Sequence, residues 1–198
     1  MPLRVARTER PLPDLCPAYA DEFQYNAATT LFSMLPRMRY WLMKSEPSDV
    51  SIDDLASLPN QTVPWYGVRN YQARNFMRDL MQAGDAVLFY HSGCAEPGVA
   101  GLARVVSPAY PDATQFDPHN RYYDARATPE TPRWFNVDVR LERKTRLMPL
   151  AELRACPELA RLRILQRGNR LSITPVEASE YDFIVSRLDD EAFRKDNP

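Results

Sequence analysis

The first strand-like run of apolar residues in this chain appears after Met38, in the stretch MRYWLMKS. Residues 40 to 43 are aromatic or apolar throughout, which is typical of a strand that is covered on both faces. The polar run KSEPSD then ends this strand. In the following stretch, SIDDLASL, Ser51 and Asp54 lie three residues apart, a spacing that resembles a capping box and predicts a short helix.

A helical pattern follows Asn70, where apolar residues recur with the i, i+3, i+4, i+7 spacing that places one face of a helix on the core. These residues are Ala73, Phe76, Met77 and Leu80. Gly84 is expected to stop the helix, because glycine readily adopts the left-handed conformation found after helix ends.

The remaining patterns predict further strands and peripheral helices. AVLFY (86–90) and GVAGLARVV (98–106) are interpreted as strands joined by HSGCAEP, and WFNVDVRL alternates so that Phe135, Val137, Val139 and Leu141 share one side. Residues 149–166 predict a helix that is interrupted near Pro157. The stretch RLSITPV predicts a final strand, and EASEYDFIVSRL predicts a closing helix. Mixed strands with helices at the periphery indicate an α+β fold around a strongly curved sheet.

The chain is expected to contain one domain with short additions at both ends. Residues 1–37 have weak periodicity and several prolines, so we interpret them as an N-terminal extension, or as a choice of start site upstream of Met38. Residues 38–188 form the predicted domain and 189–198 a C-terminal tail. A length of 198 residues is sufficient for one sizeable core.

Composition narrows the class of protein. An apolar content of 44% with 26% charged residues is that of an ordinary soluble globular protein. Cys16, Cys94 and Cys156 are odd in number and lack paired spacing, which indicates a reducing compartment without a disulfide framework or zinc site. No apolar run approaches a membrane span, and no secretory apolar block is present. We expect a cytoplasmic protein, associated with the nucleoid or, in a eukaryote, nuclear.

The charges are balanced overall but uneven along the chain. A net charge of −1 argues against a protein that grips long duplexes mainly by neutralising phosphates. Between Arg133 and Arg170, however, ten basic residues face four acidic ones. This segment predicts either one basic face or a solvated helix surface.

The stretch PWYGVRNYQARNFMR (64–78) combines flat aromatic side chains, a glycine and three arginines. Gly67 permits close approach of a ligand, and guanidinium groups beside aromatic faces suit phosphate contact and base stacking. The arginines Arg69, Arg74 and Arg78 are expected to stand away from the apolar helix face. The alternative is a packed helix entrance, with Trp65 in the core and the arginines paired with acids such as Asp79.

Other polar positions follow predicted strands. The KSEP stretch supplies an amine, a hydroxyl and a carboxylate that could read the edge of a base, or could form only a turn. His91, Ser92 and Cys94 invite a nucleophile or metal interpretation, but the sequence lacks HExxH, paired CxxC and G-x-S-x-G motifs. Phosphate-binding glycine motifs are also absent, so no cofactor is expected.

Two loops carry further candidates. The segment SPAYPDATQFDPHNRYYDARATPETPR (107–133) is long, rich in proline and aromatic, which favours a functional loop. In QRGNRLSITPV, Arg167 and Arg170 flank Gly168 before a strand. They predict a loop that meets phosphate or closes a pocket, or a basic turn at the end of the preceding helix.

Taken in order, several of these stretches resemble the EVE domain family. They are YWLMKSEP, WYGVRNYQARNFMRDLMQAGDAVLFYHS, GLARVVSPAYPDATQFDP, YYD, PRWFNVDV and RLSITPV, and they span residues 39 to 186. The resemblance implies a PUA-like fold, a small mixed-strand β-barrel flanked by helices. It also implies binding of nucleic acid, with a modified base held in an aromatic-walled pocket.

Matching position by position, the resemblance assigns the ligand-binding role to residues from several segments. They are Trp41, Lys44, Ser45, Trp65, Gly67, Val68, Arg69, Asn70, His91, Ser92, Tyr122, Tyr123, Asp124, Arg167, Arg170 and Ser172. The loop after His91 and Ser92, with Cys94 to Pro97, departs from the family pattern, as does the extension before Met38.

The leading hypothesis is therefore a monomeric, non-enzymatic reader of a modified base of the cytosine or adenine class, in DNA or RNA. The base would stack on Trp65 or a tyrosine and be checked by polar side chains from Lys44, Ser45, Asn70 and Ser92. One alternative is an enzyme that acts on modified nucleic acid or a nucleotide-like metabolite through His91 and Ser92 or Asp124. Another is a small-ligand or protein-interaction module.

Overall fold

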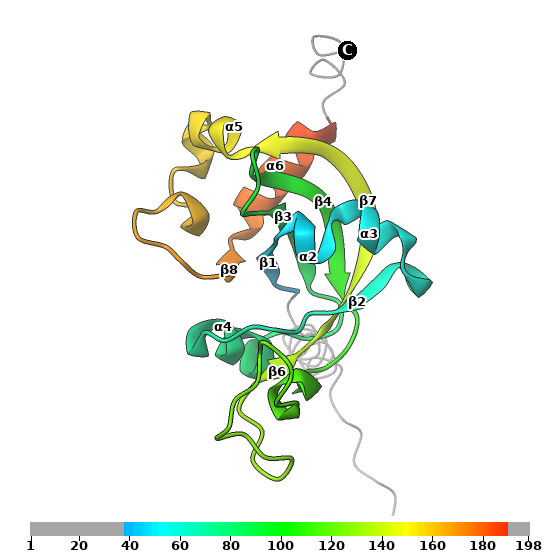
Figure 1. Ribbon diagram of the computed structural model, residues 1–198. Coiled ribbons are helices and arrows are strands. Elements are labelled where there is room, and N and C mark those ends of the chain that lie inside the picture. The colour runs from blue at the N-terminus through cyan, green and yellow to red at the C-terminus, as the bar shows by residue number, and fades with distance from the viewer. Residues whose placement is uncertain (1–37, 190–198) are drawn as a thin grey trace, which may run out of the picture. The chain divides into compact units, whose positions relative to one another are not determined.

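Six strands of the computed structural model form one mixed sheet in the order β2-β7-β4-β3-β1-β8 (Figure 1). They are β1 (Tyr40–Ser45), β2 (Thr62–Pro64), β3 (Ala86–His91), β4 (Gly98–Val105), β7 (Asp138–Pro149) and β8 (Ile173–Val176). β1 and β3 run parallel, whereas the other neighbouring strands are antiparallel. The short strands β5 (Tyr110–Pro111) and β6 (Phe135–Asn136) form a second, two-stranded sheet. The structure describes residues 38–189, so the expected extension and residues 190–198 of the tail lie outside it.

The helices are short and lie around the sheet. They are α2 (Pro47–Val50), α3 (Ile52–Ser57), α4 (Tyr71–Asn75), α5 (Leu150–Ala155) and α6 (Ala178–Asp189), with single turns η2 (Pro59–Gln61), η4 (Ala113–Phe116), η5 (Pro157–Leu159) and η6 (Arg163–Leu165). The α+β class and the mixed strands are confirmed. No helix among residues 38–189 is long and apolar enough to cross a membrane.

The sheet is strongly curved, as expected, but it is a half-barrel. Figure 1 shows the long strand β7 bending as an arc beside β4. The pairing of β4 with β7 contains two register shifts, and irregularities of this kind bend strands. Within residues 38–189, β2 and β8 remain the two edges of the sheet. The barrel that the resemblance implies is therefore only partly formed.

The first predicted elements are confirmed at the level of single contacts. Trp41, Leu42 and Met43 of β1 are buried, as a strand covered on both faces requires. The Asp54 N–H donates to the Ser51 hydroxyl at 3.0 Å, and the Ser51 N–H donates to the Asp54 carboxylate at 2.9 Å. This reciprocal pair is the capping box that opens α3.

The helix after Asn70 begins as predicted but ends differently. The Asn70 side-chain oxygen caps it by accepting from the N–H groups of Gln72 and Ala73. After α4 the chain continues as a π-helix, η3 (Phe76–Leu80), in which the Met81 N–H bonds to the Phe76 carbonyl five residues earlier. The wider turn shifts the buried face by one position. Leu80, expected in the core, is 40% exposed, and the helix ends before Gly84 is reached.

The core has two parts, one on each face of the central strands. Trp41 and Met43 of β1 face one cluster, whereas Leu42 faces the other. The first cluster includes Trp65 and Phe89, and the second is covered by α5 and α6. Burial on both faces explains why β1 and β3 have nearly continuous apolar sequences. The polar residues that follow these strands therefore lie at the end of the sheet where β1 and β3 stop.

Candidate nucleic-acid interface

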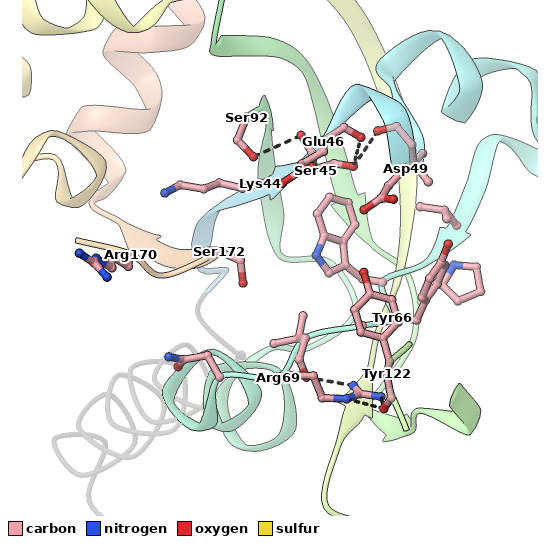
Figure 2. Close-up of a pocket in the computed structure, with 17 residues that line it drawn as sticks. Lys44, Ser45, Glu46, Asp49, Tyr66, Arg69, Ser92, Tyr122, Arg170 and Ser172 are labelled. Atoms are coloured by element: carbon pink, nitrogen blue, oxygen red, sulfur yellow. Dashed lines mark hydrogen bonds between the residues drawn. The ribbon is translucent and has the colours of Figure 1, made fainter. Parts of the chain in front are cut away.

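A cavity of about 350 Å³ lies where the parallel strands β1 and β3 end. Because these strands run side by side in the same direction, Lys44 and Ser45 meet Ser92, and the Ser92 N–H donates to the Ser45 carbonyl at 2.9 Å. β8 runs antiparallel to β1, so the residues before β8 lie beside the end of β1. There the Lys44 N–H donates to the Ser172 carbonyl at 2.8 Å. Sheet topology thus gathers polar groups from three distant segments (Figure 2).

Eleven of the expected residues line this cavity. They are Lys44, Ser45, Trp65, Gly67, Val68, Arg69, Asn70, Ser92, Tyr122, Arg170 and Ser172. Six further lining residues were not among those that the resemblance assigned: Glu46, Asp49, Val50, Val63, Pro64 and Tyr66. Glu46 and Tyr66 stand inside the KSEP and PWYGVRN stretches that drew attention in the sequence, whereas no sequence signal marked Asp49, Val50 or Val63.

Trp65 belongs both to the core and to the cavity wall. Its side chain packs edge-on against Phe89, with ring centroids 5.6 Å apart, and the residue is only 8% exposed. Its backbone N–H donates to the Val137 carbonyl at 2.8 Å, which fixes the segment against the end of β6. The two interpretations of Trp65 drawn from the sequence are therefore compatible. A rigid indole forms one wall of the cavity.

Tyr66, Gly67 and Tyr122 form a second aromatic part of the wall. The rings of Tyr66 and Tyr122 meet edge to face at 6.1 Å. Gly67 has a φ of +80°, and a Cβ built on it would lie 2.6 Å from the Tyr122 ring. The glycine is thus needed both for its backbone conformation and for the close approach of the tyrosine.

Arg69 faces inward and pairs with an acid, as the alternative interpretation of the stretch expects. Its guanidinium donates to the fully buried Asp112 at 2.8 Å and to the Tyr122 carbonyl at 2.8 Å. Its charge lies 5.3 Å from the ring centroids of both Tyr122 and Trp134. Arg69 therefore positions the aromatic wall, and its charge is largely compensated inside the protein.

The Asp112 carboxylate accepts hydrogen bonds from three residues of two segments. Burial acts to raise the pKa of its carboxyl group, but hydrogen bonds from Thr114, Arg69 and the Gly67 N–H outweigh burial and leave the pKa below its ordinary value. The Gly67 bond measures 3.0 Å. The long loop 107–133 is thereby connected to the cavity wall through a charged carboxylate.

The other two arginines of the stretch 64–78 do not line the cavity. Arg74 lies 4.8 Å over the Tyr71 ring and donates to the Arg133 carbonyl at 3.0 Å. Arg78 forms two hydrogen bonds with Asp79, at 2.6 and 2.8 Å. The local pairing considered for Arg78 is therefore present.

The side of the cavity that carries Lys44 and Ser172 presents hydrogen-bond donors that have no partner among residues 38–189. Within residues 38–189, the Lys44 ammonium makes no hydrogen bond or ion pair, and burial lowers its pKa. Asn70 uses its side-chain oxygen for the helix cap, which leaves its NH₂ group without a partner among the described residues. The Ser172 hydroxyl is likewise unpaired in this part of the chain. These donors are available to a ligand with acceptor atoms.

The opposite rim is acidic and is bridged to the long loop. In Figure 2, Glu46 and Asp49 lie across the cavity from Arg170. Asp49 accepts two hydrogen bonds of 2.8 Å from Arg121, whose guanidinium lies 4.6 Å over the Tyr122 ring. This contact joins α2 to the loop 107–133 at the cavity mouth.

Trp41 and His91 lie outside the cavity, although they belong to the strands that end there. Trp41 pairs with Val87 early in β1, and its buried indole N–H donates to Asp85 at 2.9 Å. His91 precedes Ser92, and adjacent strand residues point to opposite faces. Its Nε2 accepts from the Ile52 N–H at 3.0 Å, and burial lowers its pKa. Both residues stabilise the scaffold around the site.

Three other expected residues also lie away from the cavity. Tyr123 is 43% exposed at the surface of the long loop. Asp124 holds that loop together, since its carboxylate accepts from the Trp134 indole at 2.9 Å and from Arg133 at 3.0 Å. Arg167 lines a neighbouring groove that shares Asn70 and Arg170 with the cavity.

Fold and cavity together define a small mixed α+β domain with a preformed, aromatic-walled pocket suited to a flat, polar ligand. The chain belongs to the EVE domain family, which it matches over residues 39–187. Thymocyte nuclear protein 1 from Homo sapiens is 45% identical over 164 residues, covering 74% of this chain and 72% of the human protein. The protein of the same name from Danio rerio is 46% identical over 168 residues, covering 76% and 72%.

Solved structures agree with this assignment. A Leishmania major protein superposes with a TM-score of 0.73 at 48% identity, covering 79% of this chain and 98% of that one. The human THYN1 protein, solved in complex with 5-methylcytosine containing DNA, gives a TM-score of 0.71 at 44% identity, with 77% and 98% covered.

Proposed function

We propose that this protein is a non-enzymatic DNA-binding protein that takes a modified cytosine base into the cavity between Trp65, Tyr66 and Tyr122. The observation that carries the proposal is the cavity itself. Aromatic side chains wall a space of about 350 Å³, within the size range of small-molecule sites, and donors that are unpaired within residues 38–189 line one side of it. The human relative that was solved with 5-methylcytosine containing DNA supports the choice of cytosine and of DNA.

The chemistry of the lining suits a methylated cytosine. Stacking on the aromatic wall contributes about 1–3 kcal/mol per base, which is comparable to the few kcal/mol that unstacking costs. Selectivity must then come from the base edges. Lys44 and Asn70 supply donors for the O2 and N3 acceptors, and Glu46 supplies an acceptor for the exocyclic amine. Val63, Pro64 and Val68 provide apolar surface for a methyl group.

The enzyme alternative receives less support from the geometry. A general base for Ser92 needs a ring nitrogen that is free to accept a proton. In His91 the Nε2 already accepts the Ile52 N–H. The Asp124 carboxylate is engaged by Trp134, Arg133 and the Arg126 N–H. We therefore expect modified oligonucleotides to keep their mass after incubation with the protein, measured by mass spectrometry. A changed product mass would favour the enzyme.

Binding of matched oligonucleotides tests the proposal directly. Fluorescence anisotropy should be measured with DNA duplexes that differ at one position, which carries cytosine, 5-methylcytosine, 5-hydroxymethylcytosine, adenine or N6-methyladenine. We expect tighter binding of a modified cytosine than of cytosine, and no gain from N6-methyladenine. Equal affinity for all five duplexes would contradict the proposal. RNA oligonucleotides of the same sequence show whether the sugar affects affinity. Free nucleosides that compete as well as the oligonucleotide would identify a small-ligand module.

Two exposed tyrosines provide a matched pair of variants. Tyr66 lines the cavity and Tyr123 does not, although each is 43% exposed. We expect Tyr66→Ala to weaken binding of the preferred duplex about ten-fold or more, since stacking is worth about 1–3 kcal/mol per base. Tyr123→Ala should bind like the unmodified protein. Equal effects of the two substitutions would place the base elsewhere.

A further inference from the structure

A second hollow, of about 540 Å³, adjoins the cavity and is lined by arginines. It is called the arginine groove and is formed by Arg161, Arg163, Arg167 and Arg170 on one side and by Asn70 and Gln72 on the other. Asn70 and Arg170 also line the cavity, so the two hollows are neighbours that share these two residues. In Figure 1 the orange segment between α5 and β8 lies on the side of the sheet where α4 begins.

The four arginines of the groove differ from most other cations in their pairing. Arg69, Arg104, Arg121 and Arg133, for example, form ion pairs with carboxylates. Among residues 38–189, by contrast, none of the four groove arginines makes a side-chain hydrogen bond or an ion pair. All four are exposed. Guanidinium groups without ion pairs repel one another, so their concentration in one groove favours an anionic partner.

The backbone that carries these arginines is held in place. The Gln166 side chain donates to the Ala160 carbonyl at 2.8 Å, and the Asn169 side chain donates to the Arg163 carbonyl at 2.8 Å. The Asn169 side-chain oxygen in turn accepts from the Leu171 N–H at 3.1 Å. The segment therefore presents its charges from a fixed loop, which lowers the ordering cost of binding.

We propose that the arginine groove binds consecutive phosphates of the DNA strand whose modified base occupies the cavity. The inference rests on the proposed function and adds the path of the strand. The groove and the cavity share Asn70 and Arg170, so a nucleotide in the cavity places its own phosphate beside Arg170. The opposite rim carries Glu46, whose charge repels phosphates, and Asp49, whose charge is already compensated by Arg121. The DNA backbone on one side of the base therefore follows the groove, while the DNA backbone on the other side gains little binding energy.

A double variant of the groove tests this path. Arg163→Ala/Arg167→Ala removes two groove arginines that do not line the cavity. The control is Arg140→Ala/Arg154→Ala, because these two arginines are exposed and unpaired among residues 38–189 but line neither hollow. Dissociation constants are measured by anisotropy for the 5-methylcytosine duplex and the cytosine duplex between 50 and 200 mM salt.

We expect the groove variant to lower the slope of log K against log salt by about two, because each of the two arginines neutralises about one phosphate. Its affinity should fall equally for both duplexes, so the preference for 5-methylcytosine stays unchanged. The control should keep the original slope, and Arg163→Lys/Arg167→Lys should retain most of it. An unchanged slope in the groove variant, or an equal fall in the control, would overturn the phosphate path.

Two further arms separate the possible failures. A 5-methylcytosine nucleotide extended stepwise on either side should gain affinity on one side only, and that gain should vanish in the groove variant; equal gains on both sides would overturn the proposal. The groove variant is also tested with a polyglutamate peptide. If the substitutions abolish binding of the peptide but leave DNA binding unchanged, the groove is assigned to an acidic protein. Absence of any 5-methylcytosine preference in the original protein would refute the proposed function, and the slopes would still decide the groove.

Discussion

At the scale of single residues, Lys44 combines a cost for folding with the role in binding that we propose for it. Its ammonium is half-buried and has no partner within residues 38–189, and burial lowers its pKa. A lysine with a lowered pKa in the folded state binds fewer protons there than in the unfolded chain. Its charge therefore opposes folding at neutral pH, and stability rises as the pH increases towards 10.5. Such a group persists where a ligand uses it.

Lys44→Met is accordingly expected to stabilise the protein and to weaken recognition. The methionine keeps the length and apolar stem of lysine and removes the buried charge, which should raise the free energy of unfolding by about 0.5–1 kcal/mol. The preference for 5-methylcytosine over cytosine should fall, because the variant has no donor for the base edge at this position. Urea denaturation and anisotropy measure the two effects. Lys144→Met is the control, since Lys144 pairs with Asp53 and lies outside the cavity; a destabilised Lys44→Met protein would contradict this account.

His91 gives the fold a dependence on acid. Burial lowers its pKa from 6.5, and its neutral Nε2 accepts the first N–H of α3 from Ile52. The unfolded chain therefore takes up a proton before the folded protein does. The contribution of His91 to the free energy of unfolding is fully present above about pH 6.5 and is lost as the pH falls below this value.

We expect His91→Gln to reduce this loss, because glutamine offers a neutral acceptor at every pH. Thermal unfolding of both proteins should be followed between pH 7.5 and pH 5. The midpoint of the original protein should decrease more steeply over this range. Parallel curves for the two proteins would show that another group causes the acid response.

At the scale of elements, the long loop 107–133 is part of the site because Asp112 and Arg69 connect it to the segment before α4. Asp112 is fully buried and accepts from Arg69 and from the Gly67 N–H. Removal of one partner leaves a charge without compensation in a buried place, which costs about 3–5 kcal/mol in such pairs. The side chain of Arg69 is 22% exposed, so the lower end of this range applies.

Asp112→Asn should therefore destabilise the protein by about 3 kcal/mol and also loosen Tyr122. Because the pKa of Asp112 is lowered in the folded state, its contribution is present above the unfolded value and is lost as the pH falls through the folded one. Hydrogen exchange should show faster opening of the loop around Tyr122. The double variant Arg69→Met/Asp112→Asn measures the coupling between the two residues. Additive effects on the unfolding free energy would show that the two side chains do not act together.

The same elements show how far the sequence predicts the structure. Local patterns were sufficient for β1, for the capping box of Ser51 and Asp54, and for the beginning of the helix after Asn70. The π-turn was not visible, because the wider hydrogen bonding from Met81 to Phe76 has no distinct residue pattern. The inward direction of Arg69 depends on Asp112, which lies 43 residues further along the chain. Contacts of this kind require the tertiary fold.

The candidate site was predicted where the family motifs and the strand ends coincide. Lys44, Ser45 and Ser92 follow apolar strands, and parallel pairing of β1 with β3 brings them together. Trp41 lies in the same motif as Lys44 but at the other end of β1, so its position in a motif did not reveal its role. Asp49 lies in α2, and Val63 lies in β2, which three strands separate from β1 in the sheet, yet both residues line the cavity. Local sequence patterns do not determine this tertiary arrangement, so they could not place these two residues.

At the scale of the whole molecule, net charge and its distribution lead to a prediction for salt. The chain carries a net charge of −1, and many of its cations are compensated by carboxylates. The four arginines of the groove are the concentrated exception among residues 38–189, so this part of the chain offers few contacts to phosphates. We expect log K to fall with log salt with a slope equivalent to about two to four phosphates.

The salt dependence should be the same for duplexes with 5-methylcytosine and with cytosine. A methyl group changes contacts inside the cavity without altering the number of phosphates that are neutralised, so the two lines should run parallel and differ only in height. Anisotropy titrations at four or more salt concentrations between 50 and 200 mM measure both lines. Converging lines would mean that the modified base changes the phosphate contacts themselves. A slope near ten would contradict local binding at one nucleotide and indicate a surface that tracks a long duplex.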